Sequence, residues 1–283
     1  MLFCSGEEQS SVSLNDMASL VNEPSIILSV QDRGERGRIA RIVVDYQARL
    51  NILNSELIAQ LTSAVDSLRD DERLRALILT GAGDRAFIGG ADINEMAELD
   101  VESARAFITR LHEACAALRK LPVPVIARIS GYCLGAGLEV AASCDLRVAS
   151  EHSTFGMPEV RVGIPSVIEA ALLPRLIGWG MAARLIYTGE TISARAAADC
   201  GLIESVFPEE ELDQAVNHLV EAILEAGPRA IRLQKALLRQ WEMLSLDEAI
   251  ERGIDSFAEA YRSDEPRTLM EDFLRRKRGR VSD

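Results

Sequence analysis

The sequence contains little cysteine, and its cysteines form no pattern typical of a disulfide framework or a zinc site. There are five, an odd number, with no CxxC spacing and no histidine arranged with them as in a zinc module: Cys4, Cys115, Cys133, Cys144 and Cys200. Small secreted scaffolds and zinc modules carry paired, closely spaced cysteines. We therefore expect neither a disulfide scaffold nor a metal site, and we predict a protein of the reducing cytoplasm.

Histidine and long apolar runs are scarce as well. The three histidines, His112, His152 and His218, lie in no turn motif beside a serine or cysteine, which argues against a Ser/His/Asp or Cys/His hydrolase. No stretch approaches the ~18 apolar residues that cross a bilayer, so we expect no membrane partner. The segment 1–24 lacks both a basic start and a long apolar run. It is predicted to be a disordered leader rather than a signal peptide.

Basic residues are also fewer than acidic ones. The chain of 283 residues carries a formal net charge of −13, and its lysines and arginines are scattered until the C-terminal tail. Nucleic-acid-binding surfaces gather basic residues on one face, so we expect no nucleic-acid partner. Hydrophobic residues make up 48% of the sequence. This content and length suit one large domain, or a domain with a helical appendage.

Apolar runs rich in β-branched residues alternate with segments of helical periodicity, which predicts an α/β fold. Helices are expected at Ser55–Arg69, where Asn54 is a suitable cap, and at Ser103–Leu118, which ends before a proline-containing run. Strands are predicted at Ser25–Val30, Ile39–Asp45, Leu74–Thr80, Val125–Ser130 and Asp145–Ala149.

The pattern changes to nearly continuous helix after residue 208. We predict a core over 25–208 and a C-terminal helical module over 209–283, in which one helix begins at Pro228, a favoured first-turn residue. Packing onto the core is one interpretation of the apolar stripes on these helices. Subunit association is the alternative, because a helical layer without its own core must bury its apolar face elsewhere. The stripes contain Leu233, Leu237, Trp241 and Phe257.

Two glutamates stand at the ends of turns rich in glycine and proline. Glu139 ends the segment GYCLGAGLE, and Glu159 ends FGMPE. Two carboxylates in one cleft can divide acid and base roles, because burial and mutual repulsion raise one pKa and leave the other lower. A glycine-rich turn that runs into a helix also leaves backbone N–H groups free to hold an oxyanion. We predict Glu139 and Glu159 as a catalytic pair, with solvated helix-end glutamates as the alternative.

A second glycine-rich segment, GAGDRAFIGGAD, runs from Gly81 to Asp92 and contains the spacing GxGxxA. The dinucleotide-binding fingerprint requires a helix that starts within the glycines, whereas this chain runs on to Gly89 and Gly90. We favour a ligand-binding loop in which these two glycines let the backbone approach a ligand closely. The N–H of Ala91 would be exposed just before a helix that opens at Asp92.

Three motifs, AFIGGADINEM, VPVIARISGYCLGAGLEVAASCDLRVAS and FGMPEVRVGIP, occur in this order and resemble the enoyl-CoA hydratase/isomerase (crotonase) family. The resemblance spans roughly Ile39 to the C-terminus and includes YTGETISARAAADCGLIESVFP. It implies an α/β, crotonase-like spiral of ββα units with a C-terminal helical trimerisation module, assembled as a homotrimer or homohexamer. It also implies an acyl-CoA thioester as substrate, with CoA as part of that substrate and with no separate cofactor or metal.

The same resemblance assigns site residues position by position. The two oxyanion-hole N–H groups fall on Ala91 and on Ala136, which replaces a glycine common in the family. Both carboxylate positions of the hydratases are occupied. By analogy, Glu139 holds and deprotonates the water that attacks Cβ, and Glu159 protonates Cα. The implied reaction is the hydration of a 2-enoyl-CoA to a 3-hydroxyacyl-CoA.

Contacts to the acyl-CoA are predicted around these motifs. Arg49 resembles a basic residue near the CoA phosphates, with an exposed loop arginine as the alternative. After Pro165 the segment SVIEAALLPRLIG replaces a glycine-rich turn, so Val167 and Ile168 are expected to reshape the acyl pocket. Glu169 adds a third carboxylate, for which a simple first-turn helix position is the alternative. The predicted contacts are Arg49, Gly89, Gly90, Asp92, Met96, Gly135, Val167 and Glu169.

Two other functions are open at this point. One is enoyl-CoA isomerisation, or another enolate reaction of the family on an unusual acyl-CoA. The other is a catalytically silent scaffold that keeps the fold for its oligomer surface. The presence of both glutamates favours hydration over each of them.

Overall fold

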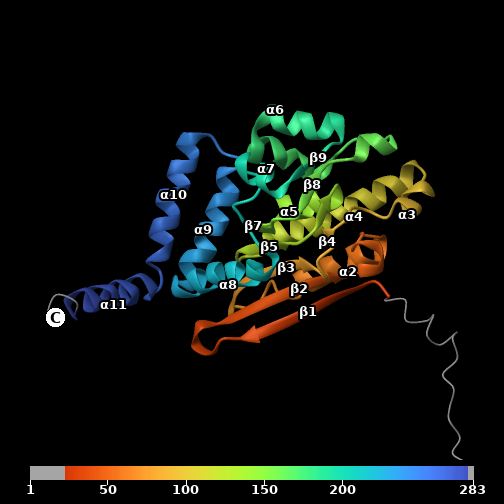
Figure 1. Cartoon of the computed structure of the whole chain (residues 1–283). Helices are drawn as coiled ribbons and strands as arrows, with labels where there is room; N and C mark the ends of the chain where they lie inside the picture. Colours follow the sequence, from red (N-terminus) through yellow and green to blue (C-terminus); the bar gives the residue numbers. More distant parts are fainter. Residues whose placement is uncertain (1–22, 280–283) are drawn as a thin grey trace, which may run out of the picture.

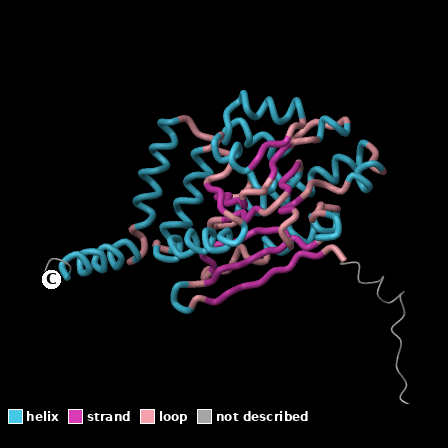
Figure 2. Tube along the Cα trace, in the orientation of Figure 1, coloured by secondary structure: helices cyan, strands magenta, loops and turns pink. Residues whose placement is uncertain are grey.

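The computed structural model describes residues 23–279, in which strands form two sheets and helices pack around them. Figures 1 and 2 show the strands at the centre and the last helices extending to one side as an arm. Except for its last two residues, the predicted leader 1–24 lies outside the described residues. No helix between residues 23 and 279 is long and apolar enough to cross a membrane.

The larger sheet has six strands. β1 and β2 form an antiparallel hairpin, and the remaining neighbours run parallel. The α/β prediction is confirmed, and the five predicted strands are found with ends displaced by at most two residues. In spatial order the strands are β1 (Ser25–Asp32), β2 (Arg38–Asp45), β3 (Leu74–Gly81), β5 (Val125–Ile129), β7 (Leu146–Ser150) and β10 (Ser205–Phe207).

Helices cover both faces of this sheet. Alternate side chains of a strand point to opposite faces: Leu77 and Leu79 pack into the main core with helices α2 (Ser55–Asp66) and α4 (Val101–Lys120). Ile78 packs on the other face, against the apolar side of α8 (Glu209–Glu225). The central strands β3 and β5 are therefore buried on both faces, which explains their nearly continuous apolar sequences, whereas the edge strand β1 is mostly exposed.

Capping residues set the starts of the two helices that the sequence predicts. The side chain of Asn54 accepts a hydrogen bond from the Leu57 N–H at 2.8 Å and begins α2 as expected. α4 begins two residues earlier than predicted, because Asp100 and Ser103 form a reciprocal capping box.

The smaller sheet was missed by sequence reasoning. Each of its strands has only three residues, too few for periodicity to be visible. The first three run parallel, and the fourth pairs antiparallel with the third. In spatial order they are β4 (Ala86–Ile88), β6 (Tyr132–Leu134), β8 (Thr154–Gly156) and β9 (Thr191–Ser193).

Short helices and 3-10 turns connect these elements. α5 follows β6 directly, and every residue of it is buried. The connecting elements are η1 (Gly34–Arg36), η2 (Gln47–Arg49), α3 (Ile93–Ala97), α5 (Ala136–Ala142), η3 (Glu159–Val162), η4 (Ile168–Leu172), α6 (Leu173–Thr188) and α7 (Ala194–Asp199).

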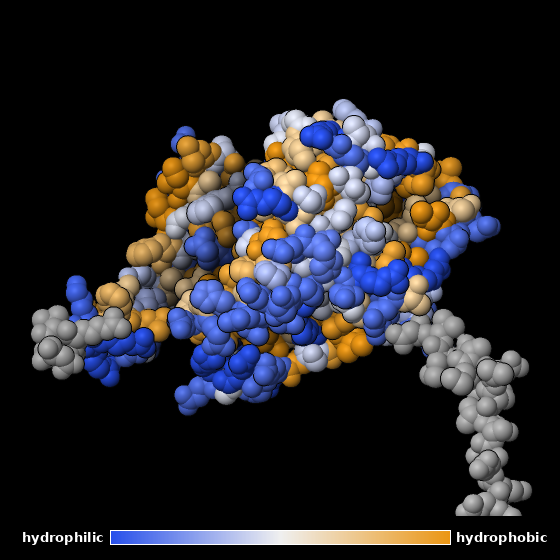
Figure 3. Space-filling model, in the orientation of Figure 1, coloured by the Kyte–Doolittle hydropathy of each residue, from blue (hydrophilic) through white to orange (hydrophobic). Residues whose placement is uncertain are grey.

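The C-terminal part is helical, as predicted, and α9 (Pro228–Trp241) begins at Pro228. α8 packs on the sheet, whereas α10 (Leu246–Ala260) and α11 (Glu265–Gly279) form the arm in Figure 1. No residue of α10 is buried, and Figure 3 shows hydrophobic residues along this arm. The division of the chain at residue 208 stays a prediction.

Candidate active site

The small sheet brings the three predicted motifs together. β4, β6 and β8 are adjacent and parallel, so their carboxyl ends lie at the same edge of the sheet. Gly89 and Gly90 follow β4, Gly135 follows β6, and Glu159 lies just after β8. Ligands of open parallel sheets bind outside the carboxyl ends of strands. This edge is therefore the candidate active site.

Backbone hydrogen bonding leaves the N–H groups of Ala91 and Ala136 unused. Leu53 forms a parallel bridge to Ala91 through the two neighbours of Ala91. The Leu53 N–H donates to the Gly90 carbonyl, and the Leu53 carbonyl accepts from the Asp92 N–H, both at 2.8 Å. This leaves the N–H of Ala91 without an acceptor within residues 23–279. Ala136 is the first residue of α5, and the N–H groups of a first helical turn have no acceptor in their own helix. Two donors suited to an oxyanion are thus available.

Glycines bring the segments of the site into close contact. Gly135 has φ +52°, a left-handed conformation that favours glycine, and a Cβ built on it would lie 2.5 Å from Glu159 Oε1. A Cβ on Gly137 would lie 2.1 Å from the Ile88 carbonyl oxygen. The first turn of α5 therefore packs directly on the end of β4, and Glu159 lies against the start of α5. Ala136, by contrast, has no positive φ, so its methyl group is accommodated as expected.

Glu139 is a buried carboxyl group beside two other carboxyl groups. Its side chain projects from α5, the residue is 4% exposed, and Oε1 accepts a hydrogen bond from the Ala170 N–H at 3.4 Å. Burial, followed by the charge of Glu159, raises the pKa of Glu139 to about 8, and the charge of Glu169 adds to the rise. The hydrogen bond from the Ala170 N–H opposes it. At neutral pH this group therefore holds a proton.

Glu159 is less deeply buried and has a hydroxyl partner. It opens η3, and the Ser166 hydroxyl donates to its Oε2 at 2.8 Å. Burial raises the pKa of Glu159, while the Ser166 hydrogen bond opposes this rise. Of the two predicted catalytic carboxyl groups, Glu159 is thus the better stabilised as an anion. Sequence reasoning missed Ser166, because nothing in its local sequence indicates the turn that brings it back to Glu159.

Replacement of Glu139 by glutamine is expected to change how stability depends on pH. The pKa of Glu139 is raised from 4.5 to about 8 by folding, so the folded protein binds this proton more tightly than the unfolded chain. The resulting contribution to stability is complete below pH 4.5 and is lost as the pH rises through 8. Between pH 6 and pH 8 the free energy of unfolding of the wild type should fall by about 2 kcal/mol relative to Glu139→Gln.

Urea denaturation at both pH values measures this difference. Glu113→Gln, at an exposed position of α4, is the matched control and should follow the wild type. Parallel curves for the wild type and Glu139→Gln over this pH range would contradict a raised pKa at Glu139.

Arg49 and Asp92 lie together and bind each other. The Arg49 guanidinium donates to both Asp92 oxygens, at 2.9 and 3.1 Å. Asp92 also caps α3 by accepting from the Asn94 N–H, which confirms the predicted helix start. The Gly89 N–H donates to the Leu50 carbonyl at 2.9 Å, so the residues around Arg49 hold the segment that carries Ala91. A contact between Arg49 and CoA phosphates stays a prediction.

The other predicted contact residues differ in burial. Met96 is half-buried and packs against the core, and Val167 is 39% exposed. Glu169 is buried in η4, and its Oε1 lies 2.9 Å from His112 Nδ1 on α4. Sequence reasoning missed His112 as a neighbour of Glu169. Ile168 has φ +41°, which is unusual for a β-branched residue.

Comparison with known proteins identifies relatives over most of the chain. A model of the enoyl-CoA hydratase/isomerase family matches residues 34–280. The short-chain-enoyl-CoA hydratase of Clostridium acetobutylicum is 33% identical over 86% of this chain and 94% of its own. The crotonyl-CoA hydratase of Syntrophomonas wolfei is 34% identical over 85% of this chain and 93% of its own.

A solved structure supports the same assignment. The crystal structure of an enoyl-CoA hydratase from Bacillus anthracis superposes with a TM-score of 0.83 at 30% identity, covering 88% of this chain and 96% of that one. The fold expected from the resemblance, with C-terminal helices after a crotonase-like core, is confirmed.

Proposed function

Because the chain belongs to the enoyl-CoA hydratase/isomerase family and is a hydratase-type enzyme, we propose that it adds water to a 2-enoyl-CoA and forms a 3-hydroxyacyl-CoA. The observation that carries this proposal is the pairing of Glu139 with Glu159 at the sheet edge where Ala91 and Ala136 leave two N–H groups unused. Hydration requires an acid, a base and an oxyanion site, and this edge supplies all three.

The N–H groups of Ala91 and Ala136 bind the thioester oxygen in this proposal. Attack of water on Cβ moves negative charge onto that oxygen, and each donor is worth about 3 kcal/mol to the transition state. Because neither donor has an acceptor within residues 23–279, no hydrogen bond from this part of the chain must break when the substrate binds. Gly89, Gly90 and Gly135 shape the backbone around the oxygen.

One proton shared by the two glutamates is sufficient for the reaction. In the free protein it rests on Glu139, and a water between the carboxyl groups passes it on: Glu139 donates to the water, and the water donates to Glu159. Glu139 then accepts a proton from this water as its oxygen attacks Cβ, and Glu159 delivers its proton to Cα. One water is consumed, and the proton again rests on Glu139, which is its resting position.

A short acyl group suits the altered pocket best. The relatives named above are a short-chain-enoyl-CoA hydratase and a crotonyl-CoA hydratase. Val167 and Ile168 add bulk beside the catalytic glutamates, and Met96 is half-buried near the helix that Asp92 opens. In the proposal these side chains contact the acyl group, while Arg49 lies toward the CoA phosphates.

An assay with crotonyl-CoA and longer 2-enoyl-CoA thioesters tests the proposal. Hydration removes the absorbance of the conjugated thioester, and in water labelled with heavy oxygen the label should enter the product at C3. The alternative reaction, isomerisation, is favoured if a 3-enoyl-CoA is converted to the 2-enoyl-CoA without a change of mass. Binding of CoA thioesters without turnover of any acyl group would favour a silent scaffold instead.

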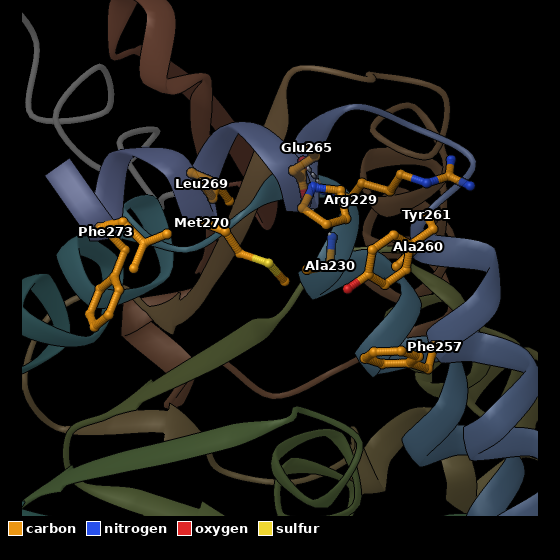
Figure 4. A pocket seen from close by; sticks show the side chains of 11 residues that line it. Arg229, Ala230, Phe257, Ala260, Tyr261, Glu265, Leu269, Met270 and Phe273 are labelled. Atoms are coloured by element: carbon orange, nitrogen blue, oxygen red, sulfur yellow. Dashed lines mark hydrogen bonds between the residues drawn. The ribbon is translucent and has the colours of Figure 1, made fainter.

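We expect a homotrimer or homohexamer of cytoplasmic location, built through the C-terminal arm. α10 and α11 form an apolar groove of about 550 Å³ with α9, and Figure 4 shows Phe257, Met270 and Phe273 along it. Phe257 and Phe273 are each 67% exposed. A second copy of the chain is the proposed occupant, since helices with so much exposed apolar surface are stable only when another surface covers them.

Replacement of Phe257 by aspartate should dissociate the assembly. A charge in an apolar interface must be desolvated without a partner, so light scattering is expected to give the mass of one subunit for the variant and of three or six for the wild type. Val101→Asp is the control, because Val101 is 86% exposed but lies on α4. A wild type that is already monomeric would contradict the proposed assembly.

A further inference from the structure

The contact between Glu169 and His112 links the catalytic region to the solvent. The Glu169 side chain is 8% exposed, whereas that of His112 is 51% exposed, and 2.9 Å separates Glu169 Oε1 from His112 Nδ1. Glu169 Oε2 is buried and has no hydrogen-bond partner among the described residues. A buried carboxyl group with one unsatisfied oxygen costs free energy, and the contact with His112 is the hydrogen bond that offsets part of this cost among the described residues.

The turn that carries Glu169 also carries a partner of Glu139. Ile168 opens η4 with φ +41°. Ala170 follows Glu169, and its N–H donates to the Val167 carbonyl at 2.9 Å and to Glu139 Oε1 at 3.4 Å. A β-branched residue in this conformation costs about 1–3 kcal/mol and persists only where its surroundings hold it. The bond to His112 attaches the turn to α4 at the next residue. It therefore helps to fix the direction of the Ala170 N–H.

We propose that Glu169, held by His112, is a positioning residue for Glu139. It acts in two ways: it holds η4 so that the Ala170 N–H faces Glu139, and its charge adds to the effects of burial and of Glu159 on that group. The inference deepens the proposed hydration and rests on it for its catalytic meaning. The effect of Glu169 on Glu139 is nevertheless a property of the free protein and can be measured without turnover.

Cationic groups also lie near η4, and the charge of Glu169 acts on Arg239. Arg119 and Arg239 both pair with Glu242, at 2.5 and 3.7 Å, and His112 is the one ion-pair partner of Glu169 in the part of the chain that the structure describes. The charged and titratable groups that share the cavity with Glu169 are His112, Arg119 and Lys120 on α4 and Arg239 on α9. On the inner side, Glu139 and Cys115 interact with the charge of Glu169.

A cavity of about 340 Å³ lies on the far side of this contact and is lined by His112, Lys120, Glu169 and Arg239. The His112 ring is half-exposed at this cavity. Glu169 lines this cavity together with three cationic side chains, Arg119, Lys120 and Arg239. Its charge therefore acts on the cavity as well as on Glu139.

Infrared difference spectroscopy of the free protein tests the inference. The C=O stretch of the buried, protonated Glu139 is identified by its loss in Glu139→Gln, and its titration is followed with pH. In Glu169→Gln, which keeps the size of the side chain and removes its charge, the midpoint should move to lower pH. Glu113→Gln, the same change on the exposed face of α4, should leave the midpoint where it is in the wild type.

Kinetics separate positioning from a general loss of structure. His112→Leu is expected to lower kcat about tenfold, equivalent to about 1.4 kcal/mol, with an unchanged KM, and His112→Gln should restore most of it because an amide can donate to Glu169. An unmoved Glu139 midpoint in Glu169→Gln, or a kcat for His112→Leu equal to that of the wild type, overturns the inference. A moved midpoint in a protein that hydrates no enoyl-CoA would instead refute the proposed function and leave the action of Glu169 on Glu139 standing.

Discussion

Replacement of Glu159 by glutamine is expected to lower kcat for hydration of crotonyl-CoA by about 10³-fold, with little change in KM. General acid catalysis contributes about 10²–10⁴-fold, and an amide cannot deliver the proton that Cα needs. The side chain keeps its size, and the Ser166 hydroxyl, which donates to Glu159 Oε2 at 2.8 Å, can donate to the amide oxygen instead. The local fold should therefore survive, and steady-state kinetics should report only the lost proton transfer.

Two further variants test whether this loss of activity is specific to the carboxyl group of Glu159. Ser166→Ala keeps the carboxyl group but removes the hydrogen bond that opposes the rise in its pKa, so we expect a smaller loss of about tenfold. Glu210→Gln, at an exposed position of α8 far along the chain from the site, should retain wild-type kcat. Near-wild-type hydration by Glu159→Gln would show that the acid is another group.

The sequence predicts five of the six strands of the large sheet and none of the small sheet. The central strands of the large sheet are buried on both faces, so they are rich in apolar residues, as in Leu74–Gly81, and are visible without knowledge of their neighbours. The strands of the small sheet have three residues each, and they lie within segments whose sequence pattern predicts glycine-rich turns. Their pairing depends on partners about 20 or more residues away, which no local pattern encodes.

The same contrast applies to the site. Glu139 and Glu159 are found from the sequence because a motif marks each position, and the structure places both at one sheet edge. Ser166 and His112 are found only in the structure. Ser166 reaches Glu159 through a turn with no clear local signal, and His112 reaches Glu169 from a helix more than 50 residues earlier in the chain. Contacts between distant segments depend on packing rather than on spacing.

Replacement of Ala136 by proline should lower kcat by about 10²–10³-fold through the loss of a single N–H group. Loss of one oxyanion donor costs about 3–4 kcal/mol in a transition state, and proline removes this donor without removing a side chain that any other contact needs. Proline is favoured at the first position of a helix, which Ala136 occupies in α5. Gly135 precedes it with φ +52° and ψ −119°, an extended conformation of the mirror-image region that glycine tolerates before proline.

Two control variants distinguish the lost donor from a disturbed helix. Val101→Pro makes the same change at the first position of α4, after an extended Asp100, and should leave both kcat and the melting temperature near their wild-type values. Ala136→Gly keeps the N–H and should retain activity within a few-fold. If Ala136→Pro is as active as Ala136→Gly, the thioester oxygen does not bind at the start of α5. If it is inactive while folded, hydration requires the Ala136 N–H and the space in front of it, as the proposed oxyanion site does.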